Sequence, residues 1–162
     1  MPLRHAGSTT PSAWVMRFAP LIAAGGEVLD FACGSGRHAR WLVSRGFRVE
    51  AADRDAVALE LLTGVPHLKV REVDLENGPW PYARQHFDGI VVTNYLFRPR
   101  LPLLLTALNP GGVLYFSNNL RSFKLDDYLK PRCIDISAQS VPEDFRNRKI
   151  HQCFRIIAKD NA

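Results

Sequence analysis

Two glycines and three aspartates stand at the ends of short hydrophobic stretches in the first half of the sequence. Asp30 comes just before the turn that contains Gly34 and Gly36, and Asp53 and Asp74 end the next two stretches. Because glycine has no Cβ atom, this turn can bend sharply and approach a ligand closely. A carboxylate at Asp53 can accept both hydroxyls of a ribose, and one at Asp74 can accept from an adenine amino group. These residue types, in this order, predict a site for a cofactor that contains adenosine.

Two cofactors are compatible with this spacing. The segment Gly34–Ala39 satisfies the dinucleotide pattern G-x-G-x-x-G/A, and Asp53 lies near the distance expected for a ribose carboxylate. Asp30 argues against NAD, because a carboxylate before the turn would repel a pyrophosphate but suits a ligand with an ammonium and a sulfonium group. The length also leaves little room for a second domain that would hold a substrate for hydride transfer. S-adenosylmethionine is therefore favoured, with NAD as the alternative.

Alternating strand and helix patterns must position these residues. Short apolar or β-branched runs predict strands, and apolar residues at helical spacing predict helices between them. We expect strands at 27–32, 47–52, 67–73, 87–93 and 113–117, two more near 132–136 and 152–158, helices at 37–45, 55–62 and 101–108, and a turn at 109–112. This order predicts a doubly wound, mostly parallel, seven-stranded α/β sheet of the Rossmann-like type. In such sheets ligands bind beyond the carboxyl ends of the strands, which is where the three aspartates fall.

Length and composition bound the domain organisation. The chain has 162 residues, of which 46% are hydrophobic and 23% charged, and this fits one globular domain. We expect a single domain with an N-terminal helical extension over 1–25, a cofactor-binding half over 26–117 and a substrate-side half over 118–162. No apolar stretch approaches the roughly 18 residues of a membrane span, and no secretory signal is evident, so we expect a cytoplasmic protein. The three cysteines form no CxxC pair, and no metal site is expected.

The middle of the chain resembles a known family. The segment Val28–Asp53 (VLDFACGSGRHARWLVSRGFRVEAAD) is similar to the first motif and the acidic second-strand end of the class I S-adenosylmethionine-dependent methyltransferases. Asp74-Leu75, Phe87–Val92 and Leu108–Gly112 resemble that family's third motif, fourth strand and the turn before its fifth strand. One departure is Ala32, where the family often has glycine. The resemblance implies that S-adenosylmethionine is held by Asp30, Ala32, Cys33, Gly34, Gly36, Asp53, Arg54, Asp74, Leu75 and Asn94.

The C-terminal third, over residues 114 to 157, resembles a second group of proteins. Its segments Ser117–Phe123 (SNNLRSF) and Asp144–Cys153 (DFRNRKIHQC) are similar to the end of the guanine-N7 half of bacterial bifunctional large-subunit rRNA guanine methyltransferases. Those enzymes carry a DPP-x-FSNS motif after the fourth strand, where this chain has Thr93–Leu96. The resemblance implies a methyltransferase that acts on a base of rRNA, with RNA as the partner.

Charge adds an independent indication of the acceptor. Between Asp88 and Asp126 the sequence has no acidic residue but several basic ones, which would suit a phosphate backbone. We expect substrate contacts from Arg98, Arg100, Asn118, Asn119, Arg121, Phe123 and Lys124. Asn94, with Tyr95 beside it, follows the fourth strand and is expected to orient the acceptor as the catalytic pair. Guanine N7 has a free lone pair and loses no proton, so its methylation requires no general base.

Three other interpretations stay open at this point. The same fold could methylate a small molecule or a soft anion, with the basic residues steering a negatively charged substrate. It could also be a non-catalytic domain that keeps its cofactor pocket, or an NAD-binding fragment. The oligomeric state is not predicted by any pattern in the sequence.

Overall fold

The fold is built on one twisted sheet. A computed structural model describes residues 9–95, 97–118, 133–135 and 150–156 of the protein. The strand order is β3-β2-β1-β4-β5-β7-β6. The bounds are β1 Glu27–Phe31, β2 Arg48–Asp53, β3 Leu68–Glu72, β4 Phe87–Thr93, β5 Leu108–Asn118, β6 Cys133–Asp135 and β7 Ile150–Ile156. Strands β1 to β5 are parallel to one another, whereas β7 pairs antiparallel with β5 and with β6.

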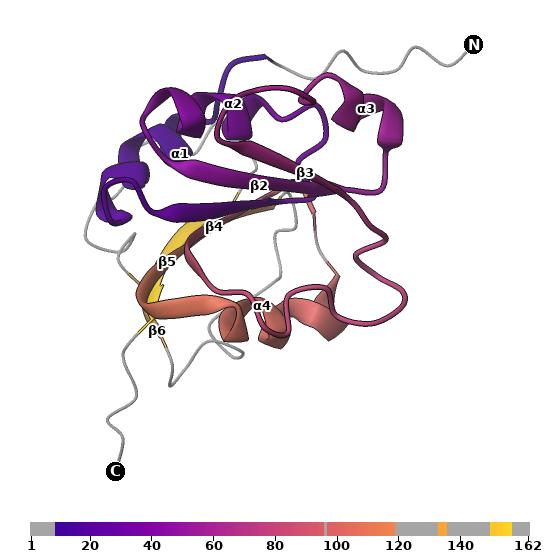
Figure 1. Ribbon diagram of the computed structural model, residues 1–162. Coiled ribbons are helices and arrows are strands. Elements are labelled where there is room, and N and C mark those ends of the chain that lie inside the picture. The colour runs from indigo at the N-terminus through magenta and orange to yellow at the C-terminus, as the bar shows by residue number, and fades with distance from the viewer. Residues whose placement is uncertain (1–8, 96, 119–132, 136–149, 157–162) are drawn as a thin grey trace.

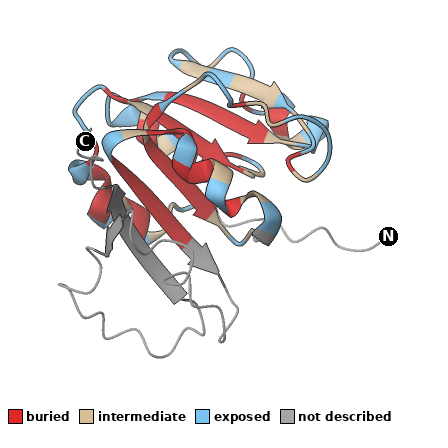
Figure 2. Ribbon diagram, turned by 90° about the horizontal axis from the view of Figure 1, so that it is seen from below, coloured by how far each residue is buried: buried red, intermediate tan, exposed pale blue. Residues whose placement is uncertain are grey.

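Helices cover both faces of this sheet (Figure 1). One face carries α1 Ala13–Phe18, the 3-10 turn η1 Ala19–Leu21, α2 Arg37–Ser44 and α3 Ala56–Glu60, and the other carries the 3-10 turn η2 Arg98–Arg100 and α4 Leu101–Thr106. Each face has its own apolar core, and the strands between them form a buried band (Figure 2). The predicted doubly wound α/β class is therefore confirmed on the five parallel strands.

Local chemistry explains where the helices begin and end. The hydroxyl of Ser12 accepts a hydrogen bond from the Trp14 N–H at 3.3 Å and caps α1. The carboxylate of Asp55 accepts from Val57 and Ala58 in the same way at the start of α3. Gly46 follows α2 with φ +90°, a conformation that glycine adopts without strain.

Several predicted elements differ from the structure at their ends, and two helices end two residues earlier than expected. Helix α3 ends at Glu60 rather than at residue 62, and α4 ends at Thr106 rather than at 108. The turn predicted at 109–112 lies inside β5, as an irregularity between the Phe87–Leu108 and Gly89–Val113 pairs. The Asn109 side chain donates to the Asp88 carboxylate at 2.9 Å and holds this irregularity against β4.

The connection between β3 and β4 shapes the second face of the sheet. Residues 73–86 contain no helix and instead pack Trp80 and Tyr82 over the strands, with ring centroids 5.5 Å apart. Beneath them, the buried carboxylate of Glu50 accepts from the Gln85 amide at 2.8 Å and pairs with Arg71. The buried charge is therefore matched by partners on β3 and on this connection, which fixes the course of the loop.

Candidate functional site

The glycine-containing turn follows β1, and hydrogen bonds hold it against the carboxyl end of β2. The Gly34 N–H donates to Asp53 Oδ2 at 2.8 Å, and the Asp55 N–H donates to Asp53 Oδ1 at 3.0 Å. The Cys33 N–H donates to the Ala52 carbonyl at 3.0 Å, which extends the pairing of β1 and β2 into the turn. Both oxygens of Asp53 are thus oriented by the backbone and keep lone pairs for a further donor such as a ribose hydroxyl.

The turn itself uses left-handed backbone at three positions. The φ angles are +56° at Ala32, +56° at Gly34 and +76° at Gly36. A Cβ atom on Gly36 would lie 2.5 Å from Leu62 Cδ1, whereas one on Gly34 would meet nothing within 4 Å. Gly36 is therefore needed for packing against Leu62, and Gly34 faces open space beside Asp53.

Asp30 lies inside the protein, directly below this turn. It is 1% exposed, and its Oδ2 atom accepts from the Ala39 N–H in α2 at 3.0 Å. Burial raises the pKa of Asp30 from 3.8 to about 7, even though the Ala39 hydrogen bond and the nearby Arg37 guanidinium act in the opposite direction. The carboxyl group therefore titrates near neutral pH and is a candidate partner for a cationic group of a ligand.

A pocket of about 220 Å³ opens beside this turn, at the ends of β2 and β3. Its lining residues are Ala32, Asp53, Arg54, Val73, Asp74, Leu75, Glu76 and Tyr95. Apolar side chains of Val73 and Leu75 and carboxylates of Asp53 and Asp74 give it the character of an adenosine site, which needs a flat apolar surface and hydrogen-bond acceptors. The donor and acceptor set of S-adenosylmethionine fits these residues.

The Asp74 carboxylate shapes one wall of the pocket. It accepts from the Glu76 N–H at 2.9 Å and from the Asn77 side chain at 2.9 Å. The Asn77 side-chain bond, together with the backbone N–H groups of Glu76 and Asn77, lowers the pKa of Asp74. The group is therefore ionised at neutral pH and can accept a hydrogen bond from an amino group.

Tyr95 closes the pocket on the side of β4. Its hydroxyl donates to the Glu76 carboxylate at 3.3 Å, and its ring packs edge-on against Phe31 with centroids 5.6 Å apart. Burial and the neighbouring Glu76 charge raise the pKa of Tyr95 to about 12, so the phenol stays protonated at neutral pH. Asn94 beside it is exposed and has φ +55°, a left-handed conformation that asparagine tolerates.

The structure brings together only part of the predicted site. Among the residues predicted for the cofactor, Ala32, Asp53, Arg54, Asp74 and Leu75 line the pocket, whereas Asp30, Cys33, Gly34, Gly36 and Asn94 do not. The Cys33 thiol is partly buried and donates to the Gly34 carbonyl at 3.4 Å, and burial raises its pKa far above the ordinary range. Glu76 and Val73 line the pocket but were not predicted, although their place beside Asp74 offered a signal.

The structure describes only some of the residues that were predicted to contact the acceptor. Arg100 donates to the Gly78 carbonyl, and its guanidinium lies over the Trp80 ring, 6.0 Å from the centroid. Arg98 lies in η2 and Asn118 ends β5, where the structure describes their backbone only. Asn119, Arg121, Phe123 and Lys124 lie outside the described residues.

Within the described part of the chain, no group of three or more His, Cys, Asp or Glu side chains is arranged to hold a metal ion. Among the same residues, no helix has the length and apolar character that crossing a membrane requires.

Comparison with known sequences places this site in context. The family described as "Methyltransferase domain" matches residues 3–155 of the chain. The ribosomal RNA large subunit methyltransferase K of Neisseria meningitidis serogroup B is 66% identical over 54 residues, which are 32% of this chain and 15% of that protein. The match thus covers only a small part of the length of this curated relative.

Two solved structures share the fold over most of their length. A TehB-like SAM-dependent methyltransferase from Corynebacterium glutamicum has a TM-score of 0.69 at 20% identity, over 88% of this chain and 86% of that one. The N-methyltransferase NodS from Bradyrhizobium japonicum, in complex with S-adenosyl-L-homocysteine, has a TM-score of 0.65 at 16% identity, over 87% and 84% of the two chains. At these identities the similarity establishes the fold of the sheet and its helices.

Proposed function

Because the chain belongs to the methyltransferase domain family, we propose that it transfers a methyl group to the N7 atom of a guanine in ribosomal RNA. It is an S-adenosylmethionine-dependent methyltransferase, and the open question is its acceptor. The observation that carries the choice of RNA is the 66% identity to a large-subunit rRNA methyltransferase over 54 residues. We propose a cytoplasmic location, since ribosomal RNA is modified there.

Residues of the pocket, with Asp30 beneath the neighbouring turn, would hold the cofactor. Asp53, fixed by the Gly34 and Asp55 N–H groups, would accept the two ribose hydroxyls. Asp74 would accept from the adenine amino group, with Leu75 against the ring. Asp30, buried below the turn, would face the ammonium end. When bound, S-adenosylmethionine supplies a methyl group that is already activated by its sulfonium.

The acceptor side needs positioning more than proton transfer. Tyr95 keeps its proton because its pKa is raised to about 12, and it is held by Glu76, so it is suited to orient an acceptor rather than to deprotonate one. Asn94 lies exposed beside it and can donate or accept a hydrogen bond at the edge of a base. This arrangement favours a nucleophile with a free lone pair, such as guanine N7, and the enzyme contributes chiefly alignment.

The acceptor can be identified by transfer of labelled methyl from S-adenosylmethionine to total RNA from cells that lack this gene. Gly34→Asp serves as the inactive variant, because it adds a carboxylate beside Asp53 where nothing lies within 4 Å. Gly64→Asp is its matched control, since Gly64 also has positive φ and open space but lies away from the pocket.

Label in a large rRNA with the unmodified protein and with Gly64→Asp, but not with Gly34→Asp, would support the proposal. Absence of label from every RNA, with cofactor binding intact by calorimetry, would contradict it. That outcome would favour a small-molecule or anionic acceptor, or a domain that only binds the cofactor.

A further inference from the structure

A second stretch of the chain has no acidic residue, and the acceptor prediction did not use it. Between Asp30 and Glu50 the sequence contains four arginines and no Asp or Glu. The stretch forms the turn after β1, helix α2 and the start of β2. Three of the arginines are exposed and the first is half-buried. We call Arg37, Arg40 and Arg45, together with the exposed Arg17 of the neighbouring helix α1, the α2 basic face.

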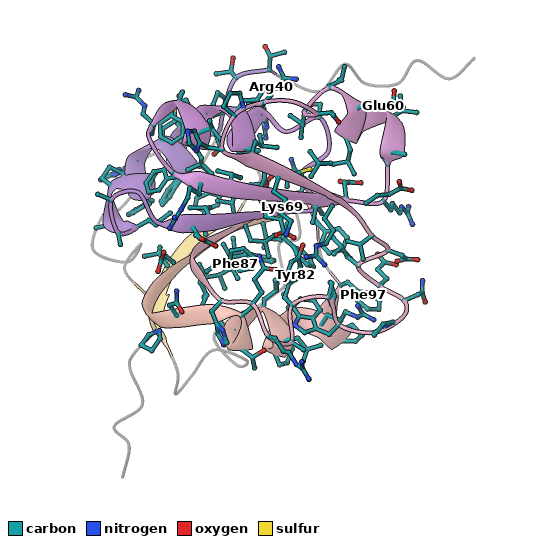
Figure 3. The ribbon with its side chains drawn as sticks, viewed as in Figure 1. Arg40, Glu60, Lys69, Tyr82, Phe87 and Phe97 are labelled. Carbon is teal, nitrogen blue, oxygen red and sulfur yellow. The ribbon has the colours of Figure 1, made fainter. Side chains whose placement is uncertain are left out.

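Helix geometry places two of these cations, Arg37 and Arg40, on one side of α2. With 3.6 residues per turn, Arg37, Arg40, Trp41 and Ser44 of α2 share a face, and Ala39 and Leu42 lie on the opposite one. Ala39 and Leu42 are fully buried against the sheet. The face that carries the arginines is therefore turned to solvent, and the labelled Arg40 lies at the top of the molecule in Figure 3.

The guanidinium groups are held in place by the protein itself. Arg45 lies over the Trp41 ring at 5.1 Å and Arg17 over the Phe18 ring at 5.6 Å. Arg37 Nη1 donates to the Thr10 carbonyl at 3.1 Å. Each of these contacts uses a ring face or one N–H and leaves further donors of a five-donor group for a ligand.

The fourth member is also tethered. Arg40 Nη2 donates to the Leu61 carbonyl in the turn after α3. Side chains held in this way lose less entropy when they bind a partner than free ones would. Arg48 of β2 does not belong to this face, because Val49 beside it packs on the α2 side of the sheet and side chains alternate along a strand.

We propose that the α2 basic face binds the phosphodiester backbone of RNA. The inference rests on the proposed function, because it gives the ribosomal RNA substrate a second contact surface beyond the acceptor side. The planar guanidinium group matches phosphate oxygens with paired N–H donors, and several such groups in a row match a polyanion better than a single anionic ligand. Helix α2 begins directly after Gly36, so the face starts at the cofactor turn and extends away from it by about 12 Å along the helix.

The test compares two double variants that each remove two positive charges. Arg40→Ala/Arg45→Ala removes two members of the face, and Lys69→Ala/Arg84→Ala removes two exposed cations from β3 and from the 73–86 connection. Binding of a fluorescein-labelled 30-nucleotide single-stranded RNA is followed by anisotropy at several salt concentrations. Affinity for S-adenosylhomocysteine, measured by calorimetry, confirms that both variants are folded.

The Arg40/Arg45 variant should bind the RNA more weakly and lower the slope of log affinity against log salt by about 1.4, because each phosphate of a single strand that the protein neutralises adds about 0.7 to that slope. Arg40→Lys/Arg45→Lys should restore most of the slope, because it keeps both charges. The Lys69/Arg84 variant should match the unmodified protein.

Equal effects of the two alanine variants would overturn the inference, because net charge rather than this face would then set the affinity. The unmodified protein could methylate rRNA while the Arg40→Ala/Arg45→Ala variant binds RNA with the same affinity as the unmodified protein. In that case only this inference fails, and the proposed function stands. If the unmodified protein neither binds nor labels RNA, the proposed function fails with it.

Discussion

Replacing Asp30 with asparagine should stabilise the fold above neutral pH while it weakens cofactor binding. The side chain is buried, and its single hydrogen bond in the described structure comes from the Ala39 N–H. Asparagine has nearly the same shape and can still accept that bond through its amide oxygen. The substitution therefore removes the buried charge and leaves the packing nearly unchanged.

The size of the effect follows from the titration of the carboxyl group. The pKa of Asp30 is 3.8 ordinarily and about 7 in the folded protein, because burial disfavours the charged form. The folded state thus binds the proton more tightly than the unfolded state, and folding stability falls as pH rises between these two values. A separation of about three pH units, at about 1.4 kcal/mol each, gives a penalty of about 4 kcal/mol above pH 7 and none below pH 4.

Urea unfolding of the unmodified protein and of Asp30→Asn at pH 4 and at pH 8 measures this penalty. The free energy of unfolding of the variant should exceed that of the unmodified protein by about 4 kcal/mol at pH 8, and the two should be nearly equal at pH 4. Glu60→Gln, at an exposed carboxylate on α3, should give no such pH-dependent difference. A difference for Asp30→Asn that is the same at both pH values would refute the assignment of the penalty to this buried carboxyl group.

Three further predictions concern the turn. Asp53→Ala should weaken binding of S-adenosylhomocysteine by about 10- to 100-fold in calorimetry, since a hydrogen bond to a charged group contributes about 1.5–3 kcal/mol; unchanged affinity would remove Asp53 from the site. Ala32→Gly should raise the free energy of unfolding by about 1 kcal/mol, because Ala32 has φ +56° and a left-handed conformation costs an L-residue about 1–2 kcal/mol; a decrease in urea unfolding would contradict this. Gly36→Ala should destabilise the protein by about 1–3 kcal/mol more than Gly34→Ala in the same assay, because only the Gly36 Cβ would meet Leu62. Equal destabilisation would show that Leu62 moves aside without cost.

The sheet and half of the pocket lining could be predicted from the sequence. The hydrophobic pattern indicates the strands, and the aspartates that could bind a cofactor stand at the ends of those strands. Strands such as Phe87–Thr93 are β-branched runs that are buried on both faces, and their carboxyl ends necessarily share one edge of a parallel sheet. The positions of Asp53 and Asp74 near each other follow from this shared edge alone. Their place in the pocket needed no information on side-chain packing.

Other features depend on contacts between segments far apart in the chain. Nothing in the local sequence indicates that Gly36 packs against Leu62, or that Tyr95 bonds to Glu76. The burial of Asp30 under the Ala39 N–H likewise comes from how α2 lies on β1. The 73–86 connection has no periodicity, so the position of Trp80 could not be foreseen, and this residue decides where the Arg100 side chain lies.

Arg100 and Arg45 show why a charge count along the sequence does not by itself locate an anion-binding surface. Both lie in stretches without acidic residues, and both stack on a tryptophan. Arg100 also donates to the Gly78 carbonyl, and its Nη1 atom is buried, so the group serves to fasten the 73–86 connection to η2. Arg45 is exposed at the end of α2, and Trp41 holds it without covering it. The same residue type therefore stabilises a loop in one place and faces solvent in the other, where we propose that it meets RNA, and the burial of its donor atoms distinguishes the two cases.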